Sequence, residues 1–197
     1  YAYEHGWVDT NHMAVRTLAG PIFPTVNLDD GQVVSVTVDM GEPILGRELI
    51  PMSGAGETVR IKTGTSFGEI ELTAVSMGNP HCVVFVPDID LVPVAAWGPE
   101  LEVHRLFPAK TNVEFVQVTN RAEMVMRVWE RGAGITLACG TGACASLVAA
   151  VLNGLTDRIA MVRLLGGDLF IEWQAKNNRV YMTGPAVEVF SGRICLG

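Results

Sequence analysis

The stretch from residue 138 to residue 154, ACGTGACASLVAAVLNG, decides the fold of this chain. Residues 141–152 are almost all Ala, Leu and Val, and the following Asn153-Gly154 is a pair that commonly ends a helix. Apolar residues occupy every side of this segment, which is typical of a helix that is buried all round. We therefore predict a central helix whose small side chains let the surrounding strands approach closely.

Short strands are predicted for most of the remaining chain, because apolar and polar residues alternate over windows too short for a helix. A second, weaker helix is predicted over residues 89–97, and the first residues up to Gly6 are typical of the last turn of a helix. The chain is thus expected to be an α+β protein in which strands curl around one central helix. The strand windows are residues 34–38, 69–72, 82–86, 113–118, 124–129, 169–173 and 186–190.

The composition favours a small molecule as the partner of this protein. The formal net charge of -7 leaves no basic patch for a nucleic acid or for an anionic membrane surface. No apolar run approaches the roughly 20 residues that span a bilayer, and no basic start followed by an apolar core indicates secretion. We therefore expect a cytoplasmic protein with neither a nucleic acid nor a membrane as partner.

The cysteines are Cys82, Cys139, Cys144 and Cys195, and their spacing matches neither a zinc site nor a dense disulfide framework. Free thiols and no metal are expected. Cys139 stands where a glycine-rich loop enters the predicted helix, and the positive end of the helix dipole there favours the thiolate. This position predicts a thiol pKa below the usual value of about 8.5. The alternative interpretation of Cys139 is a small buried hydrophobic residue.

Polar residues stand beside three of the predicted strands. Glu130-Arg131 ends one strand shortly before the thiol loop, Asn79 and His81 precede another, and Asn112 begins a third. Neighbouring Glu and Arg are usually a solvated ion pair, but they also complement the ammonium and carboxylate of an amino acid. Taken alone, the Asn and His residues are equally typical of turns and of a capped core histidine.

Four ordered motifs make the chain resemble the diaminopimelate epimerase family: GNPH at 78–81, TNVEF at 111–115, ERGAG at 130–134 and ACGTGACA at 138–145. Stretches at 17–20, 40–43 and 166–169 extend this resemblance to essentially the whole chain. The resemblance implies pseudo-symmetric domains, each a curled, mainly antiparallel β-sheet wrapped around a central α-helix, with the active site in the cleft between them. It implies a C-terminal epimerase domain over residues 40–184, and an incomplete N-terminal domain made of residues 1–39 plus 185–197.

The resemblance also implies a cofactor-independent amino acid epimerase that interconverts LL- and meso-diaminopimelate, a step toward lysine and peptidoglycan. In this family two cysteines on opposite faces of the α-carbon act as acid and base. Cys139 matches one of them, with Glu130 and His81 as its catalytic neighbours. A homodimer is the candidate assembly. The residues that the resemblance implies for substrate binding are Asn79, Asn112, Glu130, Arg131, Gly140 and Thr141.

The family's second cysteine closes a Gly-Asn-Gly-x-Arg-Cys motif, which does not occur in these 197 residues. Cys82 and Cys195 lie in strand-like runs, and Cys144 falls on a different helix face from Cys139 and is expected in the core. We therefore expect this chain alone to epimerise diaminopimelate negligibly. Three alternatives stay open: a proline-racemase-like isomerase, a hydrolase or acyltransferase with a Cys139–His81 dyad, and a non-catalytic fragment that binds a ligand.

Overall fold

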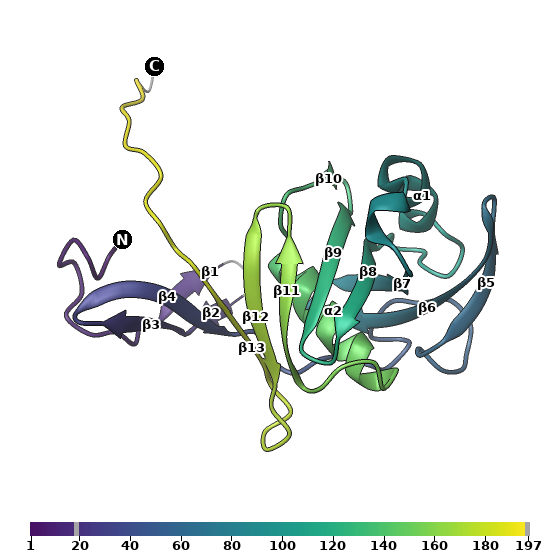
Figure 1. Cartoon of the computed structure of the whole chain (residues 1–197), viewed down its shortest axis with the longest axis horizontal. Coiled ribbons are helices and arrows are strands. Elements are labelled where there is room, and N and C mark those ends of the chain that lie inside the picture. The colour runs from purple at the N-terminus through teal and green to yellow at the C-terminus, as the bar shows by residue number, and fades with distance from the viewer. Residues whose placement is uncertain (18–19, 196–197) are drawn as a thin grey trace. The chain divides into compact units, whose positions relative to one another are not determined.

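The computed structural model describes residues 1–17 and 20–195, and Figure 1 shows its elements. Residues 18 and 19, which belong to the supporting stretch at 17–20, lie outside the described residues. Contacts divide the chain into two compact units, one made of Tyr1–Asp39 with Thr183–Gly197 and the other of Met40–Met182. No helix in the described part of the chain is both long enough and apolar enough to cross a membrane.

The first unit contains two small antiparallel pairs, β1 (Val15–Thr17) with β2 (Gly20–Ile22) and β3 (Pro24–Asp29) with β4 (Gln32–Asp39). Asp30 and Gly31 connect β3 to β4, both with positive φ, as a tight hairpin turn requires. The chain start forms one turn, in which the His5 N–H bonds the Tyr1 carbonyl at 2.9 Å, and Gly6 ends it with φ +68°.

The predicted strand over residues 186–190 is wrong, since these residues are irregular in the structure. Val187, Val189 and Phe190 are 77%, 87% and 84% exposed. Alternating apolar residues favour an extended backbone, but a strand forms only where a neighbouring strand satisfies its N–H and C=O groups. The alternation over 186–190 therefore could not predict a strand by itself.

The second unit holds a single sheet whose strands lie in the order β13-β12-β11-β9-β8-β7-β6-β5, with β10 added beside β9. The pairs β7–β8 and β9–β11 are parallel, whereas β5–β6, β6–β7, β8–β9 and β11–β12 are antiparallel. Apart from 186–190, each predicted strand window lies within a strand of the structure, except that the window 82–86 extends one residue beyond β7. The strand bounds are β5 (Ile61–Thr65), β6 (Gly68–Ser76), β7 (Pro80–Phe85), β8 (Asn112–Asn120), β9 (Glu123–Glu130), β10 (Gly134–Ile135), β11 (Ile159–Leu164), β12 (Gly167–Trp173) and β13 (Val180–Gly184).

Helix α2 (Gly140–Leu152) confirms the prediction of a central buried helix. Its residues from 142 to 150 are all buried, and it packs against β6, β7, β8, β11 and β12 (Figure 1). The small side chains of this helix allow that close approach on several sides at once.

The second predicted helix is displaced, because residues 89–97 contain a short 3-10 turn, η1 (Ile89–Leu91), followed by α1 (Val94–Glu102). Val92 between them is extended, with φ -83° and ψ 117°. The ring of Pro93 disfavours helical geometry in the preceding residue, which explains the break. The correct helix therefore starts after the proline and runs further along the chain.

Strand alternation separates the core of this unit into two clusters. In β8, Val113 and Phe115 point into the cluster on the α1 side, whereas Val116 points toward α2. In β9, Val128 packs on the α2 side, whereas Trp129 packs on the α1 side. Successive residues of a strand thus face opposite sides of the sheet. Only the polar residues on the α2 side can reach the start of that helix.

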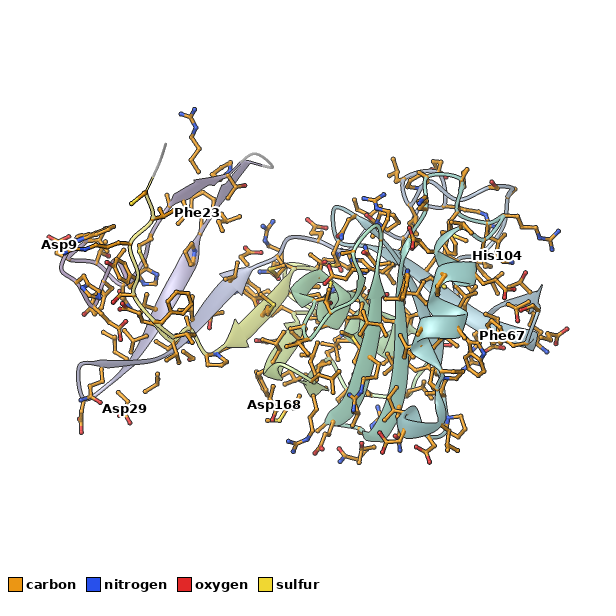
Figure 2. All side chains as sticks on the ribbon, turned by 90° about the horizontal axis from the view of Figure 1, so that it is seen from above. Asp9, Phe23, Asp29, Phe67, His104 and Asp168 are labelled. Carbon is orange, nitrogen blue, oxygen red and sulfur yellow. The ribbon has the colours of Figure 1, made fainter. Side chains whose placement is uncertain are left out.

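The α1 side is closed by aromatic packing. Phe67, labelled in Figure 2, stacks on Trp97 of α1 with ring centroids 4.3 Å apart. Gly98 lies directly on Trp129, because a Cβ at this glycine would be 2.6 Å from the Trp129 Cβ. The absence of a side chain at Gly98 is therefore what lets α1 approach β9.

We predict that Gly98→Ala lowers the free energy of unfolding by about 1–3 kcal/mol through overpacking. Intrinsic helix propensity alone would favour Ala by about 1 kcal/mol, so the expected sign distinguishes the two effects. Urea denaturation measures the change. Gly64→Ala is the matched control, since its new Cβ meets nothing within 4 Å. A Gly98→Ala protein as stable as this control would contradict the close packing on Trp129.

Candidate active site

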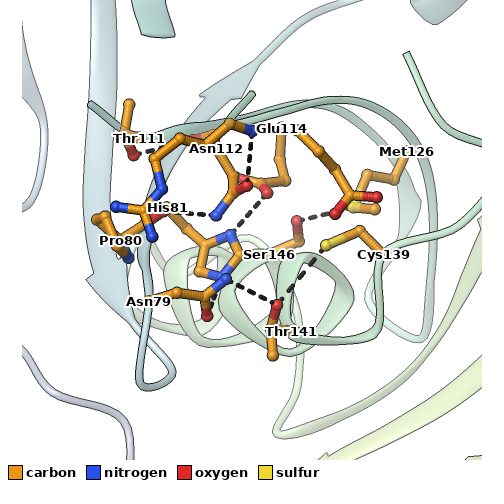
Figure 3. A network of polar contacts seen from close by, with 12 residues as sticks. Asn79, Pro80, His81, Thr111, Asn112, Glu114, Met126, Cys139, Thr141 and Ser146 are labelled. Atoms are coloured by element: carbon orange, nitrogen blue, oxygen red, sulfur yellow. Dashed lines mark hydrogen bonds and ion pairs between the residues drawn. The ribbon is translucent and has the colours of Figure 1, made fainter. Parts of the chain in front are cut away.

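Cys139 is the N-cap residue of α2, with the extended backbone angles φ -138° and ψ 107°. Its side chain is buried, with 6% exposure. The Sγ atom lies 3.6 Å from the Thr141 Oγ1 (Figure 3). The first backbone bond of the helix runs from the Ala143 N–H to the Cys139 carbonyl, so the N–H groups of Gly140 and Thr141 precede the helical ladder.

Burial and the neighbouring Glu114 raise the pKa of Cys139 to about 11. The Thr141 hydroxyl and the Gly142 N–H act in the opposite direction without outweighing burial. The sequence-based prediction of a lowered thiol pKa is therefore wrong. The helix start does provide favourable dipoles, but a thiolate at this depth loses its hydration and lies beside a carboxyl group.

His81 and Glu114 form a fully buried pair beneath the start of α2. Both are 0% exposed, and the His81 Nδ1 lies 2.7 Å from the Glu114 Oε1. Their strands, β7 and β8, run parallel and side by side, and alternation turns both side chains toward α2. The pair therefore follows from sheet register and not from proximity in the sequence.

A chain of contacts leads from this pair to the thiol (Figure 3). The His81 Nε2 lies 3.0 Å from the Asn79 Oδ1, and the Asn79 amide nitrogen donates to the Thr141 Oγ1 at 3.3 Å. Thr141 in turn contacts Cys139. The structure thus brings together four residues that the sequence singled out: Asn79, His81, Cys139 and Thr141.

Glu114 is a residue of this site that sequence reasoning did not single out. Burial raises the pKa of its carboxyl group, and the adjacent His81 opposes that effect. A signal was present in the sequence: Glu114 is a lone carboxylate among apolar residues of a strand, and Glu is almost never fully buried without a partner. What the sequence could not provide was the identity of that partner.

Glu130 and Arg131 lie at the end of β9, where a tight turn leads into β10. Gly132 and Gly134 adopt φ values of +78° and +82°, which only glycine adopts easily. The carboxylate of Glu130 accepts a hydrogen bond from the Thr136 hydroxyl. Arg131 is exposed, and its Nη1 donates to the Ala109 carbonyl at 3.2 Å. Glu130 is therefore bonded to the segment that leads into the thiol loop, whereas Arg131 is bonded to the segment before β8.

Asn112 connects this turn to β7. Its Oδ1 accepts the Arg131 backbone N–H at 2.9 Å, and its Nδ2 donates to the Pro80 carbonyl at 2.9 Å. Both ends of the amide are thus engaged with backbone groups, and the side chain is buried. In this structure Asn112 joins the segments that carry His81 and Arg131.

Glu102 at the end of α1 anchors the same turn and was also missed from the sequence. It accepts the Trp129 indole N–H at 2.7 Å and the Gly132 N–H at 3.3 Å, and it pairs with Lys110 at 3.2 Å. The Trp129 indole and the Lys110 ammonium lower the pKa of its carboxyl group against the effect of burial. Its sequence position at a helix end carried no sign of these contacts.

The other cysteines lie outside this network. Cys144 is buried in the core around α2, as predicted, and Cys82 is buried in the cluster on the α1 side. Cys195 is exposed. All four cysteines are free thiols, as the sequence predicted.

The geometry does not form a thiol–imidazole dyad between Cys139 and His81. Both ring nitrogens of His81 are engaged, one by Glu114 and one by Asn79. A nucleophilic dyad needs a base nitrogen within hydrogen-bond reach of the thiol. Here the Thr141 hydroxyl contacts the sulfur instead.

Comparison with known sequences identifies a family. The diaminopimelate epimerase family model matches residues 73–189. A diaminopimelate epimerase from Heliobacterium modesticaldum is 58% identical over 198 residues, which cover 100% of this chain and 70% of the relative. A diaminopimelate epimerase from Acetivibrio thermocellus is 52% identical over 197 residues, again 100% of this chain and 70% of the relative. The chain thus spans about 70% of the length of these relatives.

Solved structures with the same fold include a hydroxyproline epimerase from Agrobacterium vitis, with a TM-score of 0.66, 20% identity, and coverage of 93% of this chain and 60% of that chain. A predicted epimerase from Pseudomonas aeruginosa has a TM-score of 0.60 and 16% identity, covering 96% of this chain and 71% of that chain. At these identities the likeness concerns the fold alone. The family model and the sequence matches place the chain in the diaminopimelate epimerase family, a family of amino acid isomerases.

Proposed function

We propose that Cys139 is one of two opposed thiols that exchange the α-proton of diaminopimelate, interconverting its LL and meso forms. The observation that carries this proposal is a buried thiol at the N-terminus of α2, in contact with the Thr141 hydroxyl. An amino acid α-proton is a very weak acid, so its removal needs a water-poor site in which fixed dipoles stabilise the developing charge. The reaction forms a precursor of lysine and of peptidoglycan, and the family carries it out without a cofactor.

The substrate α-carboxylate is assigned to the start of α2. The N–H groups of Gly140 and Thr141 precede the helical hydrogen bonds, and the first turn of the helix carries no acidic residue. Such a helix start binds anions through its free N–H groups and its dipole. A carboxylate held there would place the α-carbon beside the Cys139 sulfur.

The substrate ammonium is assigned to Glu130, and the distal amino acid end to Asn79, Asn112 and Arg131. Glu130 lies on the α2 side of β9, together with Met126 and Val128. Its negative charge raises the pKa of Cys139. Arg131 is exposed at the turn and suits a bidentate grip on a carboxylate. The contacts of the Asn112 amide with Pro80 and Arg131 support a role in holding this turn in place as well.

The alternatives have less support. The engaged ring nitrogens of His81 argue against a hydrolase or acyltransferase with a Cys139–His81 dyad. A proline-racemase-like activity shares the fold, but the polar group formed by Asn79, Asn112 and Arg131 favours a substrate with a second polar end. A cytoplasmic location and a homodimer stay predictions.

A chimaera tests the proposed reaction, because the motif of the family's second thiol does not occur in this chain. Residues 1–197 would be joined to the part of the Heliobacterium modesticaldum relative that lies outside the matched region. In D2O the chimaera should invert LL-diaminopimelate and place deuterium at the α-carbon without releasing a fragment. The 197-residue chain alone should be at least about 100-fold slower, since it lacks one of the two acid–base groups.

Two outcomes would contradict the proposal. Comparable turnover by a chain whose intact mass matches the printed sequence would show that no second thiol from outside is needed. An acyl-enzyme burst with release of a fragment would support the hydrolase instead.

A further inference from the structure

We propose that Glu114 is a positioning residue of this site: its buried carboxylate, held by His81, keeps Cys139 in the thiol form. The consequence for catalysis rests on the proposed function, whereas the effect on the thiol itself does not. Glu114 is not among the residues for which the family resemblance implies a role.

Gly142 lies between the Glu114 carboxylate and the Cys139 sulfur, and it has no side chain that would separate them. A Cβ at this position would lie 2.7 Å from the Glu114 Oε1 and 3.2 Å from the Cys139 Sγ. The oxygen and the sulfur therefore flank the same point, with no side chain between them. Because Glu114 is 0% and Cys139 6% exposed, solvent screens their interaction poorly.

His81 fixes the carboxylate in this place. The His81 Nδ1 holds Oε1 at 2.7 Å, whereas Oε2 is buried with no hydrogen-bond partner among the described residues. The Nε2 of the ring faces the Asn79 Oδ1, which is an acceptor, so both ring nitrogens meet oxygen atoms.

No other ionisable neighbour named for Cys139 raises the pKa of this thiol as strongly as Glu114 does. Glu130 on β9 acts on Cys139 in the same direction as Glu114, but more weakly. Cys144 on α2 and Cys82 on β7 are thiols whose own pKa values are raised, mainly by burial. Glu114 also raises the pKa of Cys82, which supports its reach on both sides of its strand.

This arrangement has a direct consequence for the two-thiol reaction. A thiolate on one face removes the α-proton, while the thiol on the other face donates its proton to the α-carbon and is left as a thiolate. Before a substrate binds, the two cysteines must therefore differ in protonation. Glu114 makes Cys139 the protonated partner of the pair.

The test is the pH dependence of Cys139 alkylation by iodoacetamide, measured on the full 197-residue chain with Cys195→Ser to remove the exposed thiol. Glu114→Gln keeps the size of the side chain and can still bond His81, but it removes the charge. We expect the midpoint pH of alkylation to fall by about one unit, which corresponds to roughly 10-fold faster alkylation at pH 8. No substrate or second domain is needed for this measurement.

Two variants separate charge from shape. Glu114→Asp retains the charge, so its midpoint should stay closer to that of the parent than the midpoint of Glu114→Gln does. Glu71→Gln removes an exposed strand carboxylate and should change nothing. Intact mass counts the labels on each chain, because an unfolded variant would also expose Cys82 and Cys144. If Glu114→Gln takes up several labels, Glu114→Met provides the same loss of charge at similar length.

An unchanged or higher midpoint in a singly labelled, uncharged Glu114 variant would overturn the inference. So would a Glu114→Asp midpoint equal to that of Glu114→Gln, because shape and not charge would then be decisive. The two proposals fail separately. A chimaera that does not exchange the α-proton would contradict the proposed reaction. A shift in the alkylation midpoint would still show that Glu114 affects the protonation of Cys139.

Discussion

Replacing Cys139 by Ala in the chimaera is expected to lower the rate of epimerisation by at least about 1,000-fold, within the range that acid–base groups contribute. Alanine keeps the helix start but has no proton to donate or accept at the position of the sulfur. Inversion of LL-diaminopimelate and deuterium uptake into the meso product should decrease together, because both need the Cys139 proton. Isotope-resolved mass spectrometry and chiral chromatography measure these two quantities.

Cys195→Ala is the matched control for this loss. Cys195 is an exposed thiol in an irregular segment, so its removal should leave the rate unchanged within experimental error. Substrate binding by the Cys139→Ala chimaera should survive, because the N–H groups of Gly140 and Thr141 are unaltered. Full activity of Cys139→Ala would remove this cysteine from the mechanism.

Leu147→Ala is expected to lower the free energy of unfolding by about 2–5 kcal/mol, the usual cost of a cavity left by a deleted core leucine. Leu147 is 0% exposed in the middle of α2 and belongs to the core cluster around that helix. The helix is enclosed by strands, so the surrounding backbone has little freedom to collapse into the space. Urea denaturation followed by circular dichroism measures the change.

Leu165→Ala provides the comparison, since Leu165 is 54% exposed. Its substitution should alter the free energy of unfolding by no more than about 0.5 kcal/mol, as is usual for surface positions. Equal effects of the two substitutions would mean that α2 is not the centre of the core. Because Cys139 is the N-cap residue of α2, Leu147→Ala also tests how strongly core packing stabilises the helix that carries the thiol.

Much of the fold was predictable because its signals are local. The run of small apolar residues before Asn153-Gly154 predicted α2, and short alternation predicted β6, β8, β9 and β12. The displaced start of α1 shows where local signals conflict: apolar residues continue from 89 to 97, but Pro93 prevents a helix across Val92. Residues 186–190 have the alternation of a strand and form none in the described structure.

The sequence by itself determined which residue types stand at the start of α2, and the motifs around Cys139 and Glu130 were sufficient to indicate an amino acid isomerase. Only the tertiary structure decided that Glu114 pairs with His81 and that the pKa of Cys139 is raised. Helix and strand periodicity act over a few residues, so a sequence displays them directly. Burial and charge proximity depend on how parallel strands align residues 33 positions apart, and that alignment exists only in the folded sheet.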